Sequence, residues 1–381
     1  MTRFRGWIPA ITLVVAACTH ARPLPPVPDD RPAVADLAFR LFLIGDAGAP
    51  SNTDPVLRHL GQALAEAPDR SQAIFLGDNI YPRGLPSADD PDRAEAERRL
   101  AVQVDVVREA GAGAVFVPGN HDWDKHGPEG WDAIRRQAGF IHDRGGPAIS
   151  LLPAGGCPGP EVRDWPRLRV IFLDTQWWLH GNDRPDGPED GCPTWTEAQV
   201  ADSLRVAVAT AGDRQVVVTT HHPLASGGEH GGHFDWTRHI FPFRALKSWA
   251  WVPLPIVGSL YPAIRASGVS DQDIPGSGNR HMREALAAAV VDHPPLVWAA
   301  GHEHNLQVIR GTVARHLLVS GSGYFGHGGF AQWSDSTVYA SDRSGYMRLD
   351  VTPDGRVRLA VVVVDKAGNG REVHAEWLGH G

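Results

Sequence analysis

The sequence predicts an α/β fold in which two mixed β-sheets pack face to face and are flanked by helices. Short apolar runs rich in Val, Ile, Leu and Phe alternate with amphipathic stretches from Leu37 onward, as is typical of strands buried on both faces. Polar side chains able to bind metal, scattered from Asp46 to His304, each follow an apolar run. Because such groups gather beyond the carboxyl ends of strands, we expect one domain, residues 37–381, rather than two.

The elements follow from these runs in chain order. The predicted strands are Leu37–Ile44, Ala73–Leu76, Ala114–Val117, Arg169–Leu173, Gln215–Thr219, Leu296–Ala299 and His316–Val319. The predicted helices are Pro55–Glu66, Asp92–Glu109, Glu129–Phe140, Thr196–Ala209 and Arg280–Val290, with Asp92 and Thr196 as N-caps. From Met347 to Val373 the pattern is strand and turn, and Asp354-Gly355 predicts a hairpin.

The N-terminal segment predicts export. Arg3 and Arg5 precede a short apolar run that ends at Ala17, which is typical of a secretory signal (residues 1–17) and too short for a lasting membrane span. Val15-Ala16-Ala17-Cys18 resembles the bacterial lipobox, whose Cys is lipidated; an ordinary signal peptide with an incidental Cys is the alternative. We expect residues 18–36, which are rich in proline, to tether a lipid-anchored protein to a membrane of the bacterial envelope, facing the periplasm or the exterior.

Charge and cysteine content narrow the function classes. The formal charge is −8 and becomes −10 once the segment with Arg3 and Arg5 is removed, and no basic run is present. Nucleic acid is therefore not expected as a ligand. The two remaining cysteines, Cys157 and Cys192, predict a disulfide in an oxidising compartment, with two buried thiols as the alternative.

Five motifs share one design, in which an apolar run leads through a turn to a side chain able to bind metal. They are Gly45-Asp46, Gly77-Asp78 with Tyr81, Gly119-Asn120-His121-Asp122, Thr220-His221 and Gly301-His302-Glu303-His304. A single motif of this kind is usually only a turn. Five in this order predict a metal centre.

The set resembles the calcineurin-like metallophosphoesterases over Leu37 to Ser320, which implies a four-layer αββα sandwich. That superfamily usually has Asp-x-His in its first motif, whereas this chain has Asp46-Ala47-Gly48. The missing His is matched by Tyr81, three residues after Asp78, and this paired change resembles the purple acid phosphatases. A packed aromatic residue ahead of Pro82 is the alternative for Tyr81.

The resemblance implies two metal ions. Asp46, Tyr81 and His304 would hold one ion, Asn120, His221 and His302 the other, and Asp78 would bridge them. Three anionic oxygens favour Fe(III) at the first position, and imidazole with amide suits Zn, Mn or Fe(II) at the second.

The implied activity is hydrolysis of phosphate esters by a metal-bound hydroxide, with a phosphorylated small molecule as substrate. His121 is the family's candidate acid for the leaving group, and His230 is a second, because the run from His221 to Glu229-His230-Gly231 resembles the small, mammalian-type enzymes. His222 is expected to support or pack against a ligand, and Asp122 either orients His121 or is a solvated loop carboxylate.

Two regions leave their interpretation open. The segment at about 231–278 is aromatic and proline-rich and does not align with the family: it is a lid or substrate wall, a packed subdomain, or a surface that rests on a membrane. Its neighbourhood holds His233, His239 and His281, which we expect not to be ligands. Trp177-Trp178 either line the cleft or belong to the core.

Two alternative functions also remain open. One is a phosphodiesterase or nucleotide hydrolase with two divalent metals. The other is a non-catalytic envelope lipoprotein that retains the fold.

Overall fold

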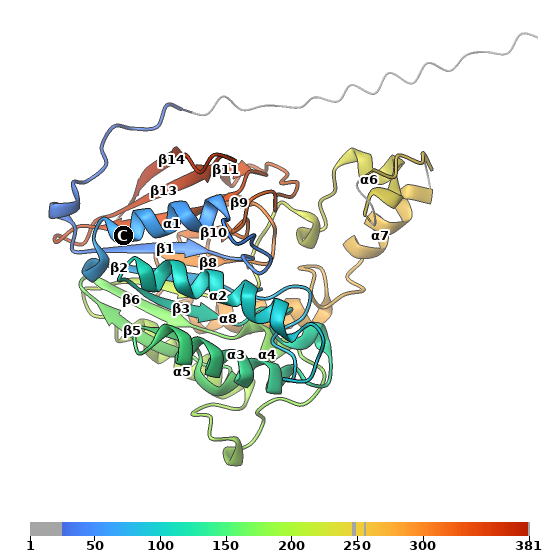
Figure 1. The fold of residues 1–381 in the computed structure, drawn as a ribbon, viewed down its shortest axis with the longest axis horizontal. Coiled ribbons are helices and arrows are strands. Elements are labelled where there is room, and N and C mark those ends of the chain that lie inside the picture. The colour runs from blue at the N-terminus through green and yellow to red at the C-terminus, as the bar shows by residue number, and fades with distance from the viewer. Residues whose placement is uncertain (1–24, 246–248, 255–256, 380–381) are drawn as a thin grey trace, which may run out of the picture.

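A computed structural model describes residues 25–245, 249–254 and 257–379, so the predicted signal segment and Cys18 lie outside the described residues. Two seven-stranded mixed sheets form the centre of the fold, and helices cover their outer faces (Figure 1). This is the predicted α/β sandwich of two mixed sheets, and the fold class is confirmed.

The first sheet has the order β14-β13-β12-β1-β2-β3-β4. Its parallel strands are β1 (Phe39–Ile44), β2 (Ser71–Leu76), β3 (Gly113–Val117) and β4 (Ile149–Leu151). The antiparallel strands β12 (Gly345–Val351), β13 (Val357–Val364) and β14 (Gly370–Leu378) extend it on the β1 side.

The second sheet has the order β11-β9-β10-β8-β7-β6-β5. Its parallel strands are β6 (Leu168–Phe172), β7 (Gln215–Thr219), β8 (Val297–Ala300) and β10 (His316–Ser320). The antiparallel strands are β5 (Glu161–Trp165), β9 (Leu306–Arg310) and β11 (Thr337–Ser341).

Helices pack on the outer face of each sheet. Those that contact the first sheet are α1 (Pro55–Ala65), α2 (Arg93–Glu109) and α3 (Gly130–Gly145). On the second sheet lie α4 (Thr175–Leu179), α5 (Glu197–Ala209) and α8 (Ser277–Ala289), and α8 contacts both of the others. The four layers therefore run helix, sheet, sheet, helix.

Alternation along the buried strands divides the core between the layers. In β1, Leu41 and Leu43 belong to the cluster between the two sheets, whereas Phe42 and Ile44 belong to the cluster beneath the helices. Residues of β1 are fully buried on both faces, which explains the continuous apolar run in the sequence.

The predicted elements are all present, with small shifts at their ends. Helix α3 continues to Gly145, five residues beyond the predicted end at Phe140. Thr196 caps α5 together with Gln199, whereas Asp92 precedes α2 without a side-chain capping bond. The hairpin at Asp354-Gly355 joins β12 to β13, and the disulfide between Cys157 and Cys192 is present.

The chain that precedes β1 is attached to the first sheet. The Pro28 carbonyl oxygen and the Asp30 carboxylate accept hydrogen bonds from Arg358, and Asp30 also accepts one from Trp377. Within the described residues, no helix combines the length and the apolar character that crossing a bilayer requires.

The segment that does not align with the family forms short helices to one side of the sandwich. It contains α6 (Trp236–Ile240) and α7 (Leu260–Ala266), which Figure 1 shows apart from the two sheets. The chain returns from α7 through Gln272 and Asp273 to α8. This path brings the end of the segment back to the motifs described next.

Candidate metal centre

The five motifs meet because their strands end side by side in the two sheets. Strands β1, β2 and β3 are neighbours in the first sheet, and β7 and β8 are neighbours in the second. Backbone hydrogen bonds connect the loops after them: Asp46 N donates to Gly77 O, and Gly301 N donates to His221 O. The structure thus brings together all seven residues predicted as metal ligands.

Three of the predicted ligands have a backbone conformation that non-glycine residues rarely adopt. Asp46, Asp78 and His302 have φ values of 56°, 53° and 67°. A left-handed residue at the end of a strand costs free energy that the surrounding structure must supply, and such residues cluster at functional sites. Gly77 allows the loop after β2 to approach His221 closely, since a Cβ atom on Gly77 would lie 2.4 Å from His221 Nδ1.

One group of donors contains Asp46, Tyr81 and His304. The Tyr81 hydroxyl lies 3.1 Å from Asp46 Oδ1 and 3.2 Å from His304 Nε2, and His304 Nε2 lies 3.6 Å from the same Asp46 oxygen. Asp46 is fully buried. Three potential ligand atoms, one from each side chain, therefore lie within 3.6 Å of one another.

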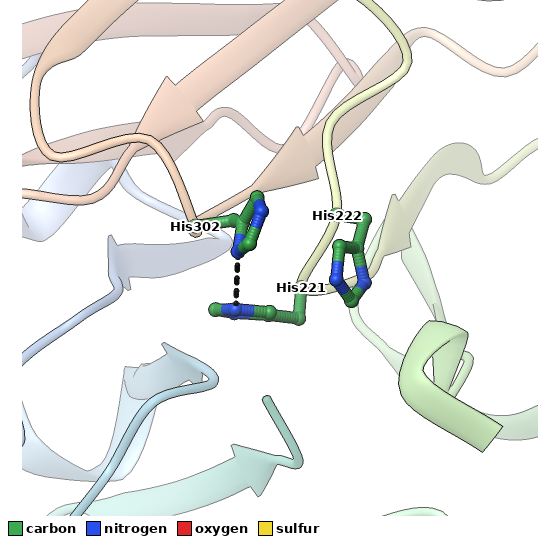
Figure 2. A group of neighbouring side chains, drawn as sticks. All are labelled: His221, His222 and His302. Carbon is green, nitrogen blue, oxygen red and sulfur yellow. Dashed lines mark hydrogen bonds between the residues drawn. The ribbon is translucent and has the colours of Figure 1, made fainter. Parts of the chain in front are cut away.

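The second group contains Asn120, His221 and His302. Asn120 Oδ1 lies 2.9 Å from His221 Nε2 and 3.1 Å from His302 Nδ1, and the two ring nitrogens are 3.1 Å apart. Figure 2 shows these two imidazoles with their nitrogens facing each other, while His222 stands to the side.

The tautomers of both rings follow from their other hydrogen bonds. His221 Nδ1 is 2.9 Å from the Leu76 carbonyl oxygen, and His302 Nε2 is 2.9 Å from the Gln272 carbonyl oxygen. A carbonyl oxygen only accepts, so each neutral ring donates outward and turns a lone pair toward Asn120. Three lone pairs then face one another without a proton between them.

A cation satisfies this arrangement. Ligands at about 2.0–2.2 Å from an ion and at right angles to each other are about 3 Å apart, which matches the separations in the second group. Burial and neighbouring histidines hold the ring pKa of His302 well below 6.5, so the ring is neutral and able to bind metal near pH 7.

Asp78 lies between the two groups. Its Oδ1 is 3.4 Å from His221 Nε2, and its carboxylate also belongs to the cluster with Asp46 and His304. Burial acts to raise its pKa, but His221 and His121 outweigh that effect and lower the pKa of Asp78 to about 2. Asp78 is therefore ionised and placed to share its oxygens between two ions.

The first group lacks positive charge of its own. Burial and the charge of Asp78 raise the pKa of Asp46 well above 3.8. Burial and the two carboxylates raise the pKa of the Tyr81 phenol well above 10. A bound cation would reverse both effects, because it favours the ionised carboxylate and phenolate.

His222 and Asp122 support the site rather than face its centre. One ring nitrogen of each of His221, His222 and His302 lies within 4.8 Å of the others, but both nitrogens of the His222 ring bond elsewhere, to Thr175 Oγ1 and Gln272 Oε1 at 2.9 Å. Asp122 is fully buried and accepts hydrogen bonds from the backbone N–H groups of Asn79, Ile80 and Gly119. The solvated interpretation of Asp122 is thus wrong, and instead of orienting His121 it ties two motif loops together.

The two predicted acids lie at the edge of the centre. His121 Nδ1 donates to the Pro82 carbonyl oxygen at 2.6 Å, and its Nε2 is 3.9 Å from Asp78 Oδ2. The His230 ring lies against the ring of His302, with centroids 3.9 Å apart, and its Nδ1 donates to Asp273 Oδ1 at 2.8 Å.

Four residues that position this edge had no role assigned from the sequence. Asp273 bonds to His230 and forms an ion pair with Arg265, and Glu303 accepts the His230 backbone N–H at 3.0 Å. His327 lies 3.5 Å from the Tyr81 hydroxyl. The apolar strand β10 precedes the loop with His327, so the rule that identified the other motifs also identifies this loop.

The remaining predicted positions lie away from these donors. His239 bonds to Ser259 and His281 to Glu197, while the His233 backbone N–H donates to Gly228. Trp177 and Trp178 are buried in the core, which agrees with the core interpretation.

Comparison with known proteins places the fold. No protein-family model and no curated protein sequence matches the chain. Among solved structures, GAP50, the anchor in the inner membrane complex of Plasmodium, is similar with a TM-score of 0.56 and 16% identity, over 90% of this chain and 88% of that one. The purple acid phosphatase PPD1 from yellow lupin (Lupinus luteus) seeds has a TM-score of 0.53 and 12% identity over 88% of this chain, which spans about half (53%) of the lupin protein.

These similarities, at low identity, concern the fold alone. The described chain has the fold of these two proteins, and two groups of His and Asp side chains in it are candidate metal sites.

Proposed function

We propose that this protein hydrolyses phosphate esters at a pair of metal ions. The observation that carries the proposal is the second donor group, where lone pairs of Asn120, His221 and His302 converge without a proton. Beside it, Asp78 reaches toward a second group that is rich in oxygen. Two adjacent ions would supply neutralisation of the phosphate oxygens and activation of a water molecule.

The residues around the ions have separable roles in this proposal. Asp78 would be a ligand of both ions. His121 is oriented by the Pro82 carbonyl oxygen and His230 by Asp273, so each turns Nε2 away from that contact. From these positions the two imidazoles would protonate the leaving oxygen or bind the phosphate group.

The first group favours a trivalent ion. Asp46, Asp78 and Tyr81 would provide three anionic oxygens once the phenol is ionised, and a strongly charged ion would oppose the rise in the phenol pKa that burial and the carboxylates cause. We therefore propose Fe(III) there, and Zn, Mn or Fe(II) at the second group.

Metal loading with visible spectroscopy tests the assignment. The iron-loaded wild type is expected to show a visible tyrosinate band and to hydrolyse phosphomonoesters. Tyr81→Phe should remove the band while the circular dichroism spectrum is unchanged. Tyr261→Phe is a matched control: this tyrosine lies on α7, outside the donor groups, so the variant should keep the band. If the wild type binds two metals and hydrolyses esters without a visible band, the assignment of iron is wrong and two divalent ions take its place. Diesters would then be the substrates to screen first.

A second candidate function follows from the similarity to GAP50, the anchor in the inner membrane complex of Plasmodium. This fold also serves a protein with an anchoring role, so a non-catalytic envelope lipoprotein is the competing proposal. The complete donor set argues for catalysis. Failure of the loaded protein to hydrolyse monoesters, diesters or nucleotides would favour the anchor.

Location and substrate belong to the same proposal. The signal-like segment and Cys18 support an exported protein, held by lipid on a membrane of a bacterial envelope. The acidic chain supports a small phosphorylated molecule rather than nucleic acid as substrate.

A further inference from the structure

Exposed apolar side chains gather on one part of the molecule. Ten of the thirteen large apolar side chains exposed in the described chain lie between Trp236 and Val269, which we call the α6–α7 lobe. They are Trp236, Phe243, Trp249, Trp251, Val252, Val257, Leu260, Tyr261, Ile264 and Val269. A concentration of this kind marks a surface that is covered by something else in its working state.

The composition of the lobe indicates what covers it. Residues 236–270 contain four cations, Arg238, Arg244, Lys247 and Arg265, and no Asp or Glu, so the segment carries +4 while the remaining chain carries −12 of the total −8. Arg238 and Arg265 pair with Glu229 and Asp273, which lie outside the segment. An anionic surface would therefore meet no carboxylate within residues 236–270, whereas the remaining chain is acidic.

Aromatic side chains add to this preference. Trp236 and Trp249 are 61% and 76% exposed, and Tyr261 is 39% exposed on α7. Tryptophan and tyrosine favour the boundary between lipid head groups and acyl chains, where the ring is partly dry and the polar atom stays wet. Apolar, aromatic and cationic residues without carboxylates are the composition of segments that lie in a membrane interface.

We propose that the α6–α7 lobe docks on an anionic lipid bilayer. The N-terminal segment agrees with this occupant: Cys18 is ten positions before Pro28, whose carbonyl oxygen is bonded to Arg358. A proline-rich segment of that length spans about 31 Å, so a lipid on Cys18 would keep the domain close to the bilayer surface. The lobe would then provide a second attachment and orient the domain.

Vesicle binding without the lipid tests the proposal. The protein is the chain from residue 18 onward with Cys18→Ser, so that no acyl group contributes. We expect it to sediment with vesicles of phosphatidylcholine containing phosphatidylglycerol, more weakly with phosphatidylcholine alone, and less at high salt. Trp236→Ser with Trp249→Ser should lower the partition coefficient at least about tenfold.

Val206→Ser with Val291→Ser is the matched control, because these side chains are 61% and 68% exposed but lie outside the lobe. This control should bind vesicles like the parent, and both double variants should retain the parent's melting temperature. Equal binding of the tryptophan variant and the parent would overturn the proposal. So would absence of binding to anionic vesicles together with self-association that the tryptophan variant loses, since the lobe would then join two copies of the chain.

Discussion

Asp78 is the carboxylate that contacts both donor groups, through His221 on one side and the cluster with Asp46 on the other. We predict that Asp78→Ala loses at least one metal ion per chain and lowers turnover at least about 10³-fold, because no neighbouring side chain replaces a bridge. Inductively coupled plasma mass spectrometry on the purified variant gives the stoichiometry. Asp213→Ala, at an exposed carboxylate, should keep both ions. Two ions per chain in Asp78→Ala would contradict the bridging role.

His121 and His230 are oriented through different contacts, so their replacement separates acid catalysis from metal binding. His121→Asn and His230→Asn should each keep the metal content and lower turnover by about 10²–10⁴-fold. The loss should shrink for nitrophenyl phosphate, whose leaving group needs little protonation. His121 should show the larger loss, since the Pro82 carbonyl oxygen fixes it beside the metal centre. Equal losses for good and poor leaving groups would make both residues phosphate binders.

Asp273 is a positioning residue for His230. It accepts from His230 Nδ1 and is itself held by Arg265. Asp273→Ala should lower turnover less than His230→Asn does, but with the same dependence on the leaving group. In the double variant, the loss should equal that of His230→Asn alone, because both changes act on one ring. Additive losses would show that Asp273 acts on the fold or on the metal instead.

The junction between β6 and α4 carries a buried acid that belongs to neither donor group. Asp174 caps α4 by accepting from the Trp177 backbone N–H and also accepts from Trp123 Nε1. Burial raises the pKa of Asp174 to about 7. The folded protein therefore retains this proton up to neutral pH, whereas the unfolded chain releases it near pH 4.

The raised pKa of Asp174 makes its contribution to stability larger at low pH than at neutral pH. The contribution of Asp174 to stability is fully present below about pH 4 and is lost as the pH rises to about 7, a change on the order of 4 kcal/mol. Asp174→Asn can still cap the helix and does not titrate. Relative to the metal-free wild type, its free energy of unfolding in guanidinium chloride should rise between pH 4 and 7 and then stay level. Parallel curves for the two proteins would show that Asp174 is ionised throughout.

Strand ends were easier to predict from the sequence than the contacts of irregular segments. Ligands such as His302 were predictable because each follows a buried strand, whose continuous apolar pattern marks where the loop begins. The Gln272 carbonyl oxygen was not predictable as a partner of His302, since it lies in a segment without periodicity. It reaches His302 only because the chain after α7 folds back toward the metal donors. Strand β5 was missed because its residues are half-exposed and charged, and its pairing with β6 defines it.

The relative positions of the metal donors depend on both sheets, because the donor loops follow strands of each. The inner apolar cluster, shared by strands such as β1 and β8, sets the distance between the loops that carry Asp46 and His302. Asp46 Oδ2 accepts the His302 backbone N–H at 2.7 Å, a direct bond between the two halves. Any change that separates the sheets should therefore disturb the metal centre before the rest of the fold.

The disulfide is a constraint on the whole chain that lies apart from the metal donors. Cys157 precedes β5 and Cys192 precedes α5, and the bond between these buried residues closes a loop with a sequence separation of 35. Loop-closure entropy for that length is about 4 kcal/mol, so Cys157→Ser with Cys192→Ser should lower the free energy of unfolding by about 2–4 kcal/mol.

Guanidinium chloride unfolding with and without reductant measures the difference. The reduced wild type and the double variant should unfold at the same denaturant concentration, below the oxidised wild type, and the variant should be insensitive to reductant. Metal content should stay equal in all three, because the predicted ligands lie in other loops. In the chain beginning at Ala21, thiol titration after denaturation should find no reactive group without reductant. Two reactive thiols in that experiment would show that the mature protein does not form the bond.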